Sequence, residues 1–216
     1  MKTIRVSVLR AVPAFAQGLV RDLRVRWALE EAGESYSEHV IGPEEQNSEP
    51  YRRLQPFGQV PVYEEGDLAL FESGAIVHHI AQRSEALMPA DAAGRARATA
   101  WMFAAMNSIE PAIQNLTTID LVYAQEDWAK ARRPGALEFA QRRLQDLATW
   151  LDGKRYLEDR FTAADLLMTT VLRMPRHTNL VAQIPVLENY RLRCEARPAF
   201  QRALAAQMAV FARHAA

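Results

Sequence analysis

The architecture of this chain follows from two motifs, Pro56-Phe57-Gly58-Gln59-Val60-Pro61-Val62-Tyr63 and Phe71-Glu72-Ser73-Gly74-Ala75-Ile76. Together they predict a turn, a strand, a second turn, a second strand and the start of a helix. Because Pro61 lacks the N–H that a central strand donates, we expect it at the first residue of its strand. A proline after a glycine-containing turn is also a candidate for a cis peptide, which would turn the backbone groups of Val60 outward to meet an extended peptide.

The second motif predicts a site for a charged ligand. Glu65-Gly66-Asp67 is a hairpin-type turn before a short strand, and Ser73 stands where a helix N-cap is expected. The N–H groups and the positive dipole end at residues 72–75 would attract a carboxylate, while Glu72 could pair with an ammonium group. The two motifs would therefore hold both charged ends of an amino acid.

These motifs resemble the glutathione-binding half of the glutathione S-transferase superfamily, and the resemblance, closest to bacterial-type cytosolic members, spans the whole chain. It implies that the backbone of Val60 beside Pro61 pairs with the cysteinyl part of glutathione. It further implies that Glu72 and Ser73 bind the γ-glutamyl end and that Gln59 reaches toward the glycine carboxylate. The alternative, an ordinary hairpin followed by a capped helix, explains each motif singly but not their spacing.

The elements around the motifs predict a thioredoxin-like βαβαββα domain over residues 1–83, as in that family. Residues 4–9 alternate as a strand, residues 18–32 carry two apolar helical stripes ended by Gly33, and residues 35–40 form a parallel second strand. Because two stripes bury a helix on two sides, we expect this helix to lie between the sheet and a second domain. A short helix then begins at Ser48.

Residues 84–94 read as a linker and residues 95–216 as an all-helical domain. We expect a long helix over 95–123 with a kink at Pro111, a second over 134–152, and two more near 186–196 and 199–213. Thr162 and Asp165 have capping-box spacing before an apolar run. The same box occurs in the resembled family, where its role is structural.

Composition excludes several classes of function. The 216 residues contain 26 basic and 26 acidic side chains without a block of one sign, so we expect no nucleic-acid or membrane-surface partner. No run is long and apolar enough to span a membrane, so we expect no membrane-spanning segment. Adjacent helical residues such as His78 and His79 point too far apart to share a metal ion, so we expect no metal site. The single Cys194 and the absence of a signal-peptide core upstream of the first strand predict a cytoplasmic protein.

The sequence departs from the resembled family at the catalytic position. That family usually activates the glutathione thiol with a Tyr, Ser or Cys just after the first strand. No Ser, Thr, Tyr, Cys or Asn occurs from Val8 to Glu34. We therefore expect Gln17, Arg21 and nearby main-chain N–H groups to stabilise the thiolate. Asn107 or Tyr123 are alternative donors, and Arg21 and Gln17 could equally be ordinary surface residues.

The resemblance implies an enzyme that binds glutathione as co-substrate and adds its thiolate to an apolar electrophile, or exchanges it with a disulfide, in detoxification. A wall for that second substrate would come from Val12, Phe15, Trp101, Phe103 and Met106, each of which could instead be core. The alternative function is a non-catalytic glutathione-binding or scaffold protein of the same fold. The family also implies a homodimer, which would bury residues 64–83 against the partner's first long helix of the second domain.

Overall fold

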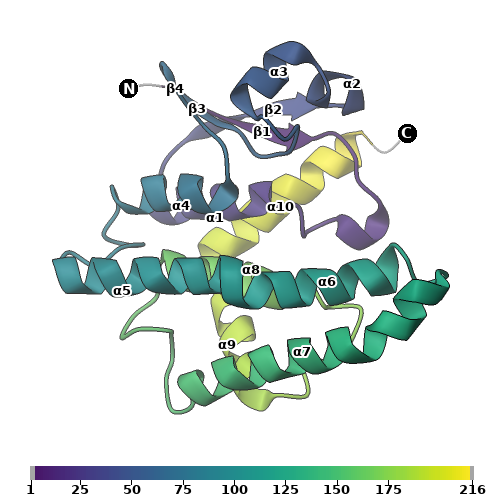
Figure 1. Ribbon diagram of the computed structural model, residues 1–216. Coiled ribbons are helices and arrows are strands. Elements are labelled where there is room, and N and C mark those ends of the chain that lie inside the picture. Colours follow the sequence, from purple (N-terminus) through teal and green to yellow (C-terminus); the bar gives the residue numbers. More distant parts are fainter. Residues whose placement is uncertain (1–2, 215–216) are drawn as a thin grey trace. The chain divides into compact units, whose positions relative to one another are not determined.

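The structure is a computed structural model that describes residues 3–214. Residues 1–2, which the sequence places directly before the first strand, and residues 215–216 lie outside that range. The chain forms two compact units, and each is described by itself. The first comprises residues 3–88 and 197–214, and the second comprises residues 89–196 (Figure 1).

The first unit is built on a four-stranded mixed sheet with the strand order β2-β1-β3-β4. β1 (Ile4–Leu9) runs parallel to β2 (Tyr36–Ile41) and antiparallel to β3 (Tyr63–Glu65), which pairs with β4 (Leu68–Leu70). Ile4, Val6, Ser7 and Val8 of the inner strand β1 are buried, because helices cover both faces of the sheet (Figure 1). The predicted thioredoxin-like order is confirmed.

Helices cover both faces of this sheet (Figure 1). The sequence order gives η1 (Ala14–Ala16), α1 (Asp22–Ala32), α2 (Pro43–Gln46), α3 (Glu49–Leu54), α4 (Ser73–Ala81) and the terminal α10 (Pro198–Arg213). α2 and α3 lie on one face, and α1 and α4 lie on the other. α1 starts later than predicted because residues 14–19 form a 3₁₀ turn first, and it ends as predicted at Gly33 with φ 71°.

The outer side of α1 is covered by α10, which therefore belongs with the first unit. Trp27 and Phe200 meet edge to face with ring centroids 4.8 Å apart. Buried Arg26 donates to Asp22 at 2.7 Å, and Gln207 donates to the other oxygen of Asp22 at 2.7 Å. The two stripes of α1 are thus explained by the sheet and α10, whereas the sequence assigned α10 to a helical domain 95–216. The division into residues 1–83, 84–94 and 95–216 stays a prediction.

The second unit consists of helices: α5 (Ala92–Phe103), the π-helical turn η2 (Ala104–Ile109), α6 (Glu110–Leu121), α7 (Asp127–Leu151), α8 (Ala163–Leu172) and α9 (Pro185–Glu195). The long helix predicted over 95–123 is interrupted by η2 just before Pro111. A proline lacks an N–H and its ring clashes with the carbonyl four residues back, so the preceding turn widens.

The predicted start of a helix at Pro134 is wrong, because α7 begins at Asp127 and carries Pro134 inside it. Its first turns are held by packing and charge that outweigh the lost hydrogen bond: Ala129 is fully buried, and Arg133 donates to Asp120 at 2.7 and 3.1 Å. Apart from Ala129, residues 127–133 are exposed, so this part of α7 carries no apolar stripe that marks a helix in the sequence.

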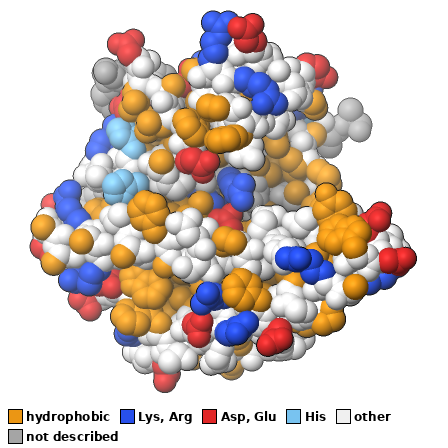
Figure 2. Space-filling view, viewed as in Figure 1, with side chains coloured by type: hydrophobic (Ala, Val, Ile, Leu, Met, Phe, Trp, Pro, Cys, Tyr) orange, Lys and Arg blue, Asp and Glu red, His pale blue; other side chains and the backbone are white. Residues whose placement is uncertain are grey.

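Figure 2 shows basic and acidic side chains interspersed over the face in view. Among residues 3–214, no helix has both the length and the apolar character that crossing a bilayer requires.

Candidate functional site

The candidate site is centred on the loop before β3. The Val60–Pro61 peptide is cis, as predicted. Pro61 is buried but lies two residues ahead of β3 rather than at its first residue, because regular pairing with β1 begins at Tyr63. Val62, just before β3, is bonded to the inner strand β1: its N–H donates to Ser7 Oγ at 2.7 Å, and its carbonyl accepts from Ser7 N at 2.9 Å.

A chain of hydroxyl groups holds this loop. Tyr51 Oη donates its single proton to the carbonyl of Gln59 at 2.7 Å, so Ser7 Oγ, 2.8 Å away, must be the donor to Tyr51. Ser7 Oγ in turn accepts the N–H of Val62. Burial raises the pKa of Tyr51, which keeps its proton in place. Backbone groups on both sides of Val60 are thereby fixed from the core.

The turn that leads into the loop is held from α2 and α3. Gln46 Nε2 donates to the carbonyl of Gly58 at 2.6 Å, and the N–H of Gly58 bonds the carbonyl of Gln55 at 2.9 Å. Gly58 has φ 62°, and a Cβ there would lie 3.2 Å from the carbonyl oxygen of Gln46, so glycine is required. Gln59 is exposed and Val60 is half-buried. Their backbone is held in place by the hydrogen bonds described above.

The second motif lies at the start of α4. Ser73 is the first helical residue and Glu72 occupies the N-cap, so the predicted N-cap role of Ser73 is wrong by one position. The reason is the backbone of Glu72, which has φ 66° and ψ 110° and turns the chain sharply into the helix. A non-glycine residue at positive φ costs about 1–3 kcal/mol, and such strain is concentrated at functional sites.

Two charged side chains, those of Arg24 and Glu72, lie next to Ser73. Arg24 of α1, which is buried, donates to Ser73 Oγ at 3.3 Å. The side chain of Glu72 is exposed and makes no capping hydrogen bond. A guanidinium, the N-terminal end of α4 and a carboxylate therefore occur together, which suits the two opposite charges of an amino-acid end.

The predicted thiol-activating residues lie in the segment between β1 and α1. Gln17 ends η1 and Arg21 occupies the N-cap of α1, both half-buried, with Gly18 at φ 77° between them. Phe15 is 47% exposed and Val12 is half-buried. Gln17, Arg21, Phe15 and Val12 all belong to the first unit, but their roles stay predictions.

The second unit contains the remaining candidates for contact with the electrophile and for thiol activation, and they differ in how exposed they are. Trp101 is half-buried and packs on the exposed Trp150 with ring centroids 5.0 Å apart. Phe103 is 63% exposed, and Met106 lies half-buried in η2. The alternative donors Asn107 and Tyr123 are both exposed, with the Tyr123 ring 5.1 Å from that of Trp128.

The capping box is confirmed as a structural feature. Thr162 and Asp165 cap each other at the start of α8, and Asp165 also accepts from the N–H of Leu157 at 2.9 Å and from Tyr190 Oη at 2.9 Å. Cys194 is fully buried in α9. Within residues 3–214, no group of three potential metal ligands occurs.

Sequence reasoning missed Ser7, Tyr51, Arg24 and Gln46. Ser7 alone carried a signal, because it is the polar residue between Val6 and Val8 in a strand with apolar neighbours on both sides. The other three lie in helices, and their partners are 8, 12 and 49 residues away in the chain, beyond the reach of a helical repeat, so no local pattern marks them.

Comparisons with known proteins agree with this geometry. Residues 16–82 match the family "Glutathione S-transferase, N-terminal domain". The chain is 33% identical to glutathione S-transferase 3 of Zea mays over 174 residues, which cover 71% of this chain and 73% of that protein. It is 33% identical over 134 residues to a glutathione S-transferase of Hyoscyamus muticus, covering 55% of this chain and 59% of that protein, so that match spans less than two thirds of the relative's length.

Two solved structures resemble the fold closely. One is a glutathione transferase from Burkholderia graminis with two glutathione molecules bound per subunit, with a TM-score of 0.81 and 26% identity over 94% of this chain and 88% of that one. The other is a theta class glutathione S-transferase from Xanthomonas axonopodis pv. citri with glutathione bound, with a TM-score of 0.78 and 26% identity over 94% and 98%. Together with the site geometry, these matches show that the chain belongs to the glutathione S-transferase family.

Proposed function

We propose that this protein is a glutathione transferase that binds glutathione on its first unit and transfers the thiolate to an apolar electrophile. The observation that carries the proposal is the supported loop at Val60–Pro61, together with the charged start of α4, in a fold whose solved relatives hold glutathione. Gln59 would meet the glycine carboxylate, the backbone of Val60 the cysteinyl unit, and Glu72 and Ser73 the γ-glutamyl end.

The fixed loop explains how such binding becomes favourable. When an extended peptide binds, both the peptide and the loop that receives it lose conformational entropy. Here the loop is already held by Tyr51, Ser7 and Gln46, so its own loss of entropy on binding is small. The peptide then gains backbone hydrogen bonds without paying to order its partner. Glu72 and the N–H groups of α4 add charge-assisted contacts of about 1.5–3 kcal/mol each.

The chemistry requires that the thiol loses its proton before it attacks. The thiolate forms the new bond to carbon, the electrophile releases its leaving group or accepts the electron pair, and the thiol proton goes to solvent. Arg21, Gln17 and the N–H groups at the start of α1 would stabilise the sulfur anion. Val12, Phe15, Trp101, Phe103 and Met106 remain the candidates for contact with the electrophile, and disulfide exchange by the same thiolate is the second reaction the site would support.

Ultraviolet titration of the bound thiol tests the catalytic part. In the parent protein we expect bound glutathione to form thiolate at a lower pH than free glutathione, and Arg21→Ala or Gln17→Ala to raise that pH. Arg53→Ala, an exposed arginine paired with Glu49, serves as the control and should have no effect. If neither variant changes the titration, Asn107 or Tyr123 becomes the candidate donor; if the parent shows no depression, a non-catalytic glutathione-binding protein is the better proposal.

We also propose a cytoplasmic homodimer. In the hairpin and the residue that follows it, Leu68 is 37% and Phe71 38% exposed, and a partner's α5–α6 region would cover them together with α4. Sedimentation at micromolar concentration should therefore give twice the chain mass of 24.4 kDa, and a monomer would contradict it.

A further inference from the structure

The start of α1, where the proposed transferase stabilises its thiolate, is held by a side chain of α10. Gln207 is buried, and its Nε2 donates to the carbonyl of Val20 at 3.1 Å and to Oδ1 of Asp22 at 2.7 Å. These two acceptors flank Arg21, the N-cap of α1. One side chain of α10 therefore fixes the residue before and the residue after the guanidinium that we assign to the sulfur anion.

The orientation of the Gln207 amide follows from its partners. The carbonyl of Val20 can only accept a hydrogen bond, so the NH₂ group of Gln207 must face it. The amide oxygen, Oε1, is buried and has no hydrogen-bond partner among residues 3–214. A buried oxygen without a partner destabilises the folded state. The amide thus serves the start of α1 at the expense of its own oxygen.

Asp22 connects this contact to a longer path of hydrogen bonds. Its other oxygen, Oδ2, accepts from Arg26 Nε at 2.7 Å, and Arg26 also donates to Glu38 of β2 at 2.6 Å. Arg213, again from α10, donates to the second oxygen of Glu38 at 2.8 Å. The path leaves α10 at Gln207, crosses α1 and β2, and returns to α10. Both carboxylate oxygens of Asp22 are thereby occupied by donors of α1 and α10.

The charge of Asp22 matters for the sulfur because like charges repel. Asp22 follows Arg21 directly, so an uncompensated carboxylate there would oppose a thiolate at the start of α1. Burial raises the pKa of Asp22, although the charge and hydrogen bond of Arg26 and the hydrogen bond of Gln207 act against that shift. Arg26 and Gln207 therefore both compensate the carboxylate.

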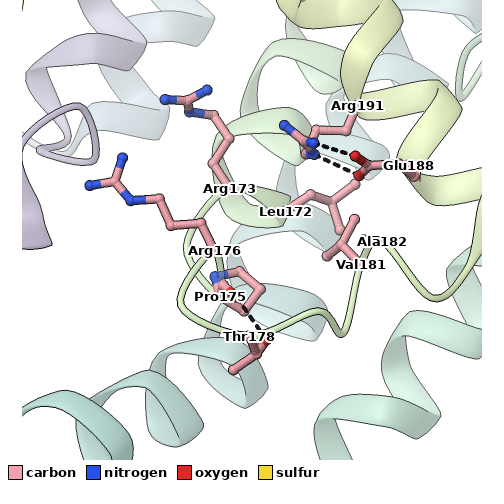
Figure 3. Close-up of a pocket in the computed structure, with 9 residues that line it drawn as sticks. All are labelled: Leu172, Arg173, Pro175, Arg176, Thr178, Val181, Ala182, Glu188 and Arg191. Atoms are coloured by element: carbon pink, nitrogen blue, oxygen red, sulfur yellow. Dashed lines mark hydrogen bonds and ion pairs between the residues drawn. The ribbon is translucent and has the colours of Figure 1, made fainter.

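An ion pair of the second unit shows how different this setting is. Glu188 accepts from Arg191 at 2.6 and 3.0 Å, and the pair lines a cavity of about 250 Å³ (Figure 3). Both of these residues belong to α9. Arg26, in contrast, is fully buried, and its pair with Glu38 joins α1 to β2. A buried pair between two segments holds one arrangement of them, because breaking it leaves a charge without compensation.

We propose that Gln207 is a positioning residue for the proposed transfer reaction. It fixes Val20 and Asp22 so that the start of α1 presents its N–H groups and the Arg21 guanidinium to the sulfur anion. Because this role exists only at the thiolate site, it rests on the proposed function. Gln207 does not touch glutathione; it acts through the backbone of Val20 and through the compensated carboxylate of Asp22.

Ultraviolet titration of bound glutathione in the full-length protein tests the proposal. Gln207→Met keeps the length of the side chain but removes both donors, so the thiolate should form at least about 0.5 pH unit higher than in the parent. Gln207→Glu keeps the shape and adds a carboxylate beside Asp22, so it should raise that pH further. The Kd of S-methylglutathione, which has no thiol proton, should change less than about twofold in either variant, because the peptide-binding loop is untouched.

Val210→Ala is the matched control, because Val210 is a buried residue of α10 whose truncation removes packing but no side-chain hydrogen bond. It should lower the melting temperature and leave the thiol titration unchanged. A parent that depresses the thiol pKa while Gln207→Met and Gln207→Glu match it would overturn this inference alone. Equal shifts in Val210→Ala and Gln207→Met would also overturn it, since the effect would then follow stability. A parent without any depression would overturn it together with the proposed function.

Discussion

At the scale of single residues, the site depends on groups that never touch the ligand in our proposal. Tyr51 and Ser7 bind backbone atoms of Gln59 and Val62; Tyr51 lies in a core with Ile41 and Val62, and Ser7 is buried. A hydroxyl in such a place fixes one loop geometry, because an unpaired backbone carbonyl or N–H in the core is costly. The two residues therefore position the backbone on which recognition relies.

Replacement of Tyr51 by Phe tests this positioning. The variant keeps the ring and its packing but leaves the Gln59 carbonyl without its hydroxyl donor and the Ser7 proton without its acceptor, so unfolding free energy should fall by about 1–3 kcal/mol. Glutathione should bind severalfold more weakly because the loop is less ordered. Urea unfolding and calorimetry measure the two effects, with Tyr156→Phe in the second unit as control; a variant that matches the parent in both would show that the hydroxyl chain has no role.

At the scale of elements, two clusters of hydrogen bonds fix helix ends in the second unit. Asp165 accepts from the N–H groups of Leu157 and Thr162 and from the hydroxyl of Tyr190. These contacts join the start of α8 to the preceding loop and to α9. The cap thus organises three segments rather than one helix end.

We expect Asp165→Ala to lower the free energy of unfolding by at least about 3 kcal/mol, because several buried donors lose their acceptor at once. Asp127→Ala is the matched control, since Asp127 is a fully exposed first-turn acid of α7 that pairs with Lys130 at 3.1 Å. Its loss should cost under about 1 kcal/mol. Equal effects of the two changes in urea unfolding would refute the assigned role of Asp165.

Asp120 links α6 to α7 and to the turn after α8 through Arg133 and through His177 Nε2 at 3.1 Å. Burial raises the pKa of Asp120, but the hydrogen bonds and charges of Arg133 and His177 outweigh it, so the pKa is lowered. A lowered pKa contributes stability that is present above the unfolded value of about 3.9 and is lost as pH falls through the folded one.

The stability difference between the parent and Asp120→Asn should therefore depend on pH. We expect about 1 kcal/mol in favour of the parent at pH 7, which shrinks toward zero as the pH falls below about 4. Asp159→Asn, an exposed acid of the same unit, provides the control. A difference that stays constant from pH 7 to pH 3 would mean that the charge of Asp120 contributes nothing.

At the scale of the molecule, local sequence signals were enough for most elements. Alternation in residues 4–9, the cap at Ser48, the Thr162–Asp165 box and the Val60–Pro61 turn each reflect chemistry contained in a few neighbouring residues. Contacts between distant segments were not predictable in this way. The packing of α10 on α1 and the bond from Arg24 to Ser73 join residues far apart in the chain, and only the folded structure reveals them.

The errors have a common physical origin. Pro134 predicts a helix start from its missing N–H, but packing of Ala129 and the Arg133–Asp120 pair extend α7 through it. Ser73 has the chemistry of an N-cap, yet the positive φ of Glu72 moves the cap back by one residue. In both places tertiary interactions outweigh an intrinsic preference worth a few kcal/mol.

The central claim is that the first unit binds glutathione along the Val60 loop and the start of α4. Calorimetric titration of glutathione into the parent, Glu72→Ala and Ser73→Ala tests it most directly, with Glu49→Ala and Ser35→Ala as exposed controls. The account predicts binding to the parent, a loss of about 1.5–3 kcal/mol in each site variant, and no change in either control. No binding to the parent, or unchanged affinity in both site variants, would contradict it.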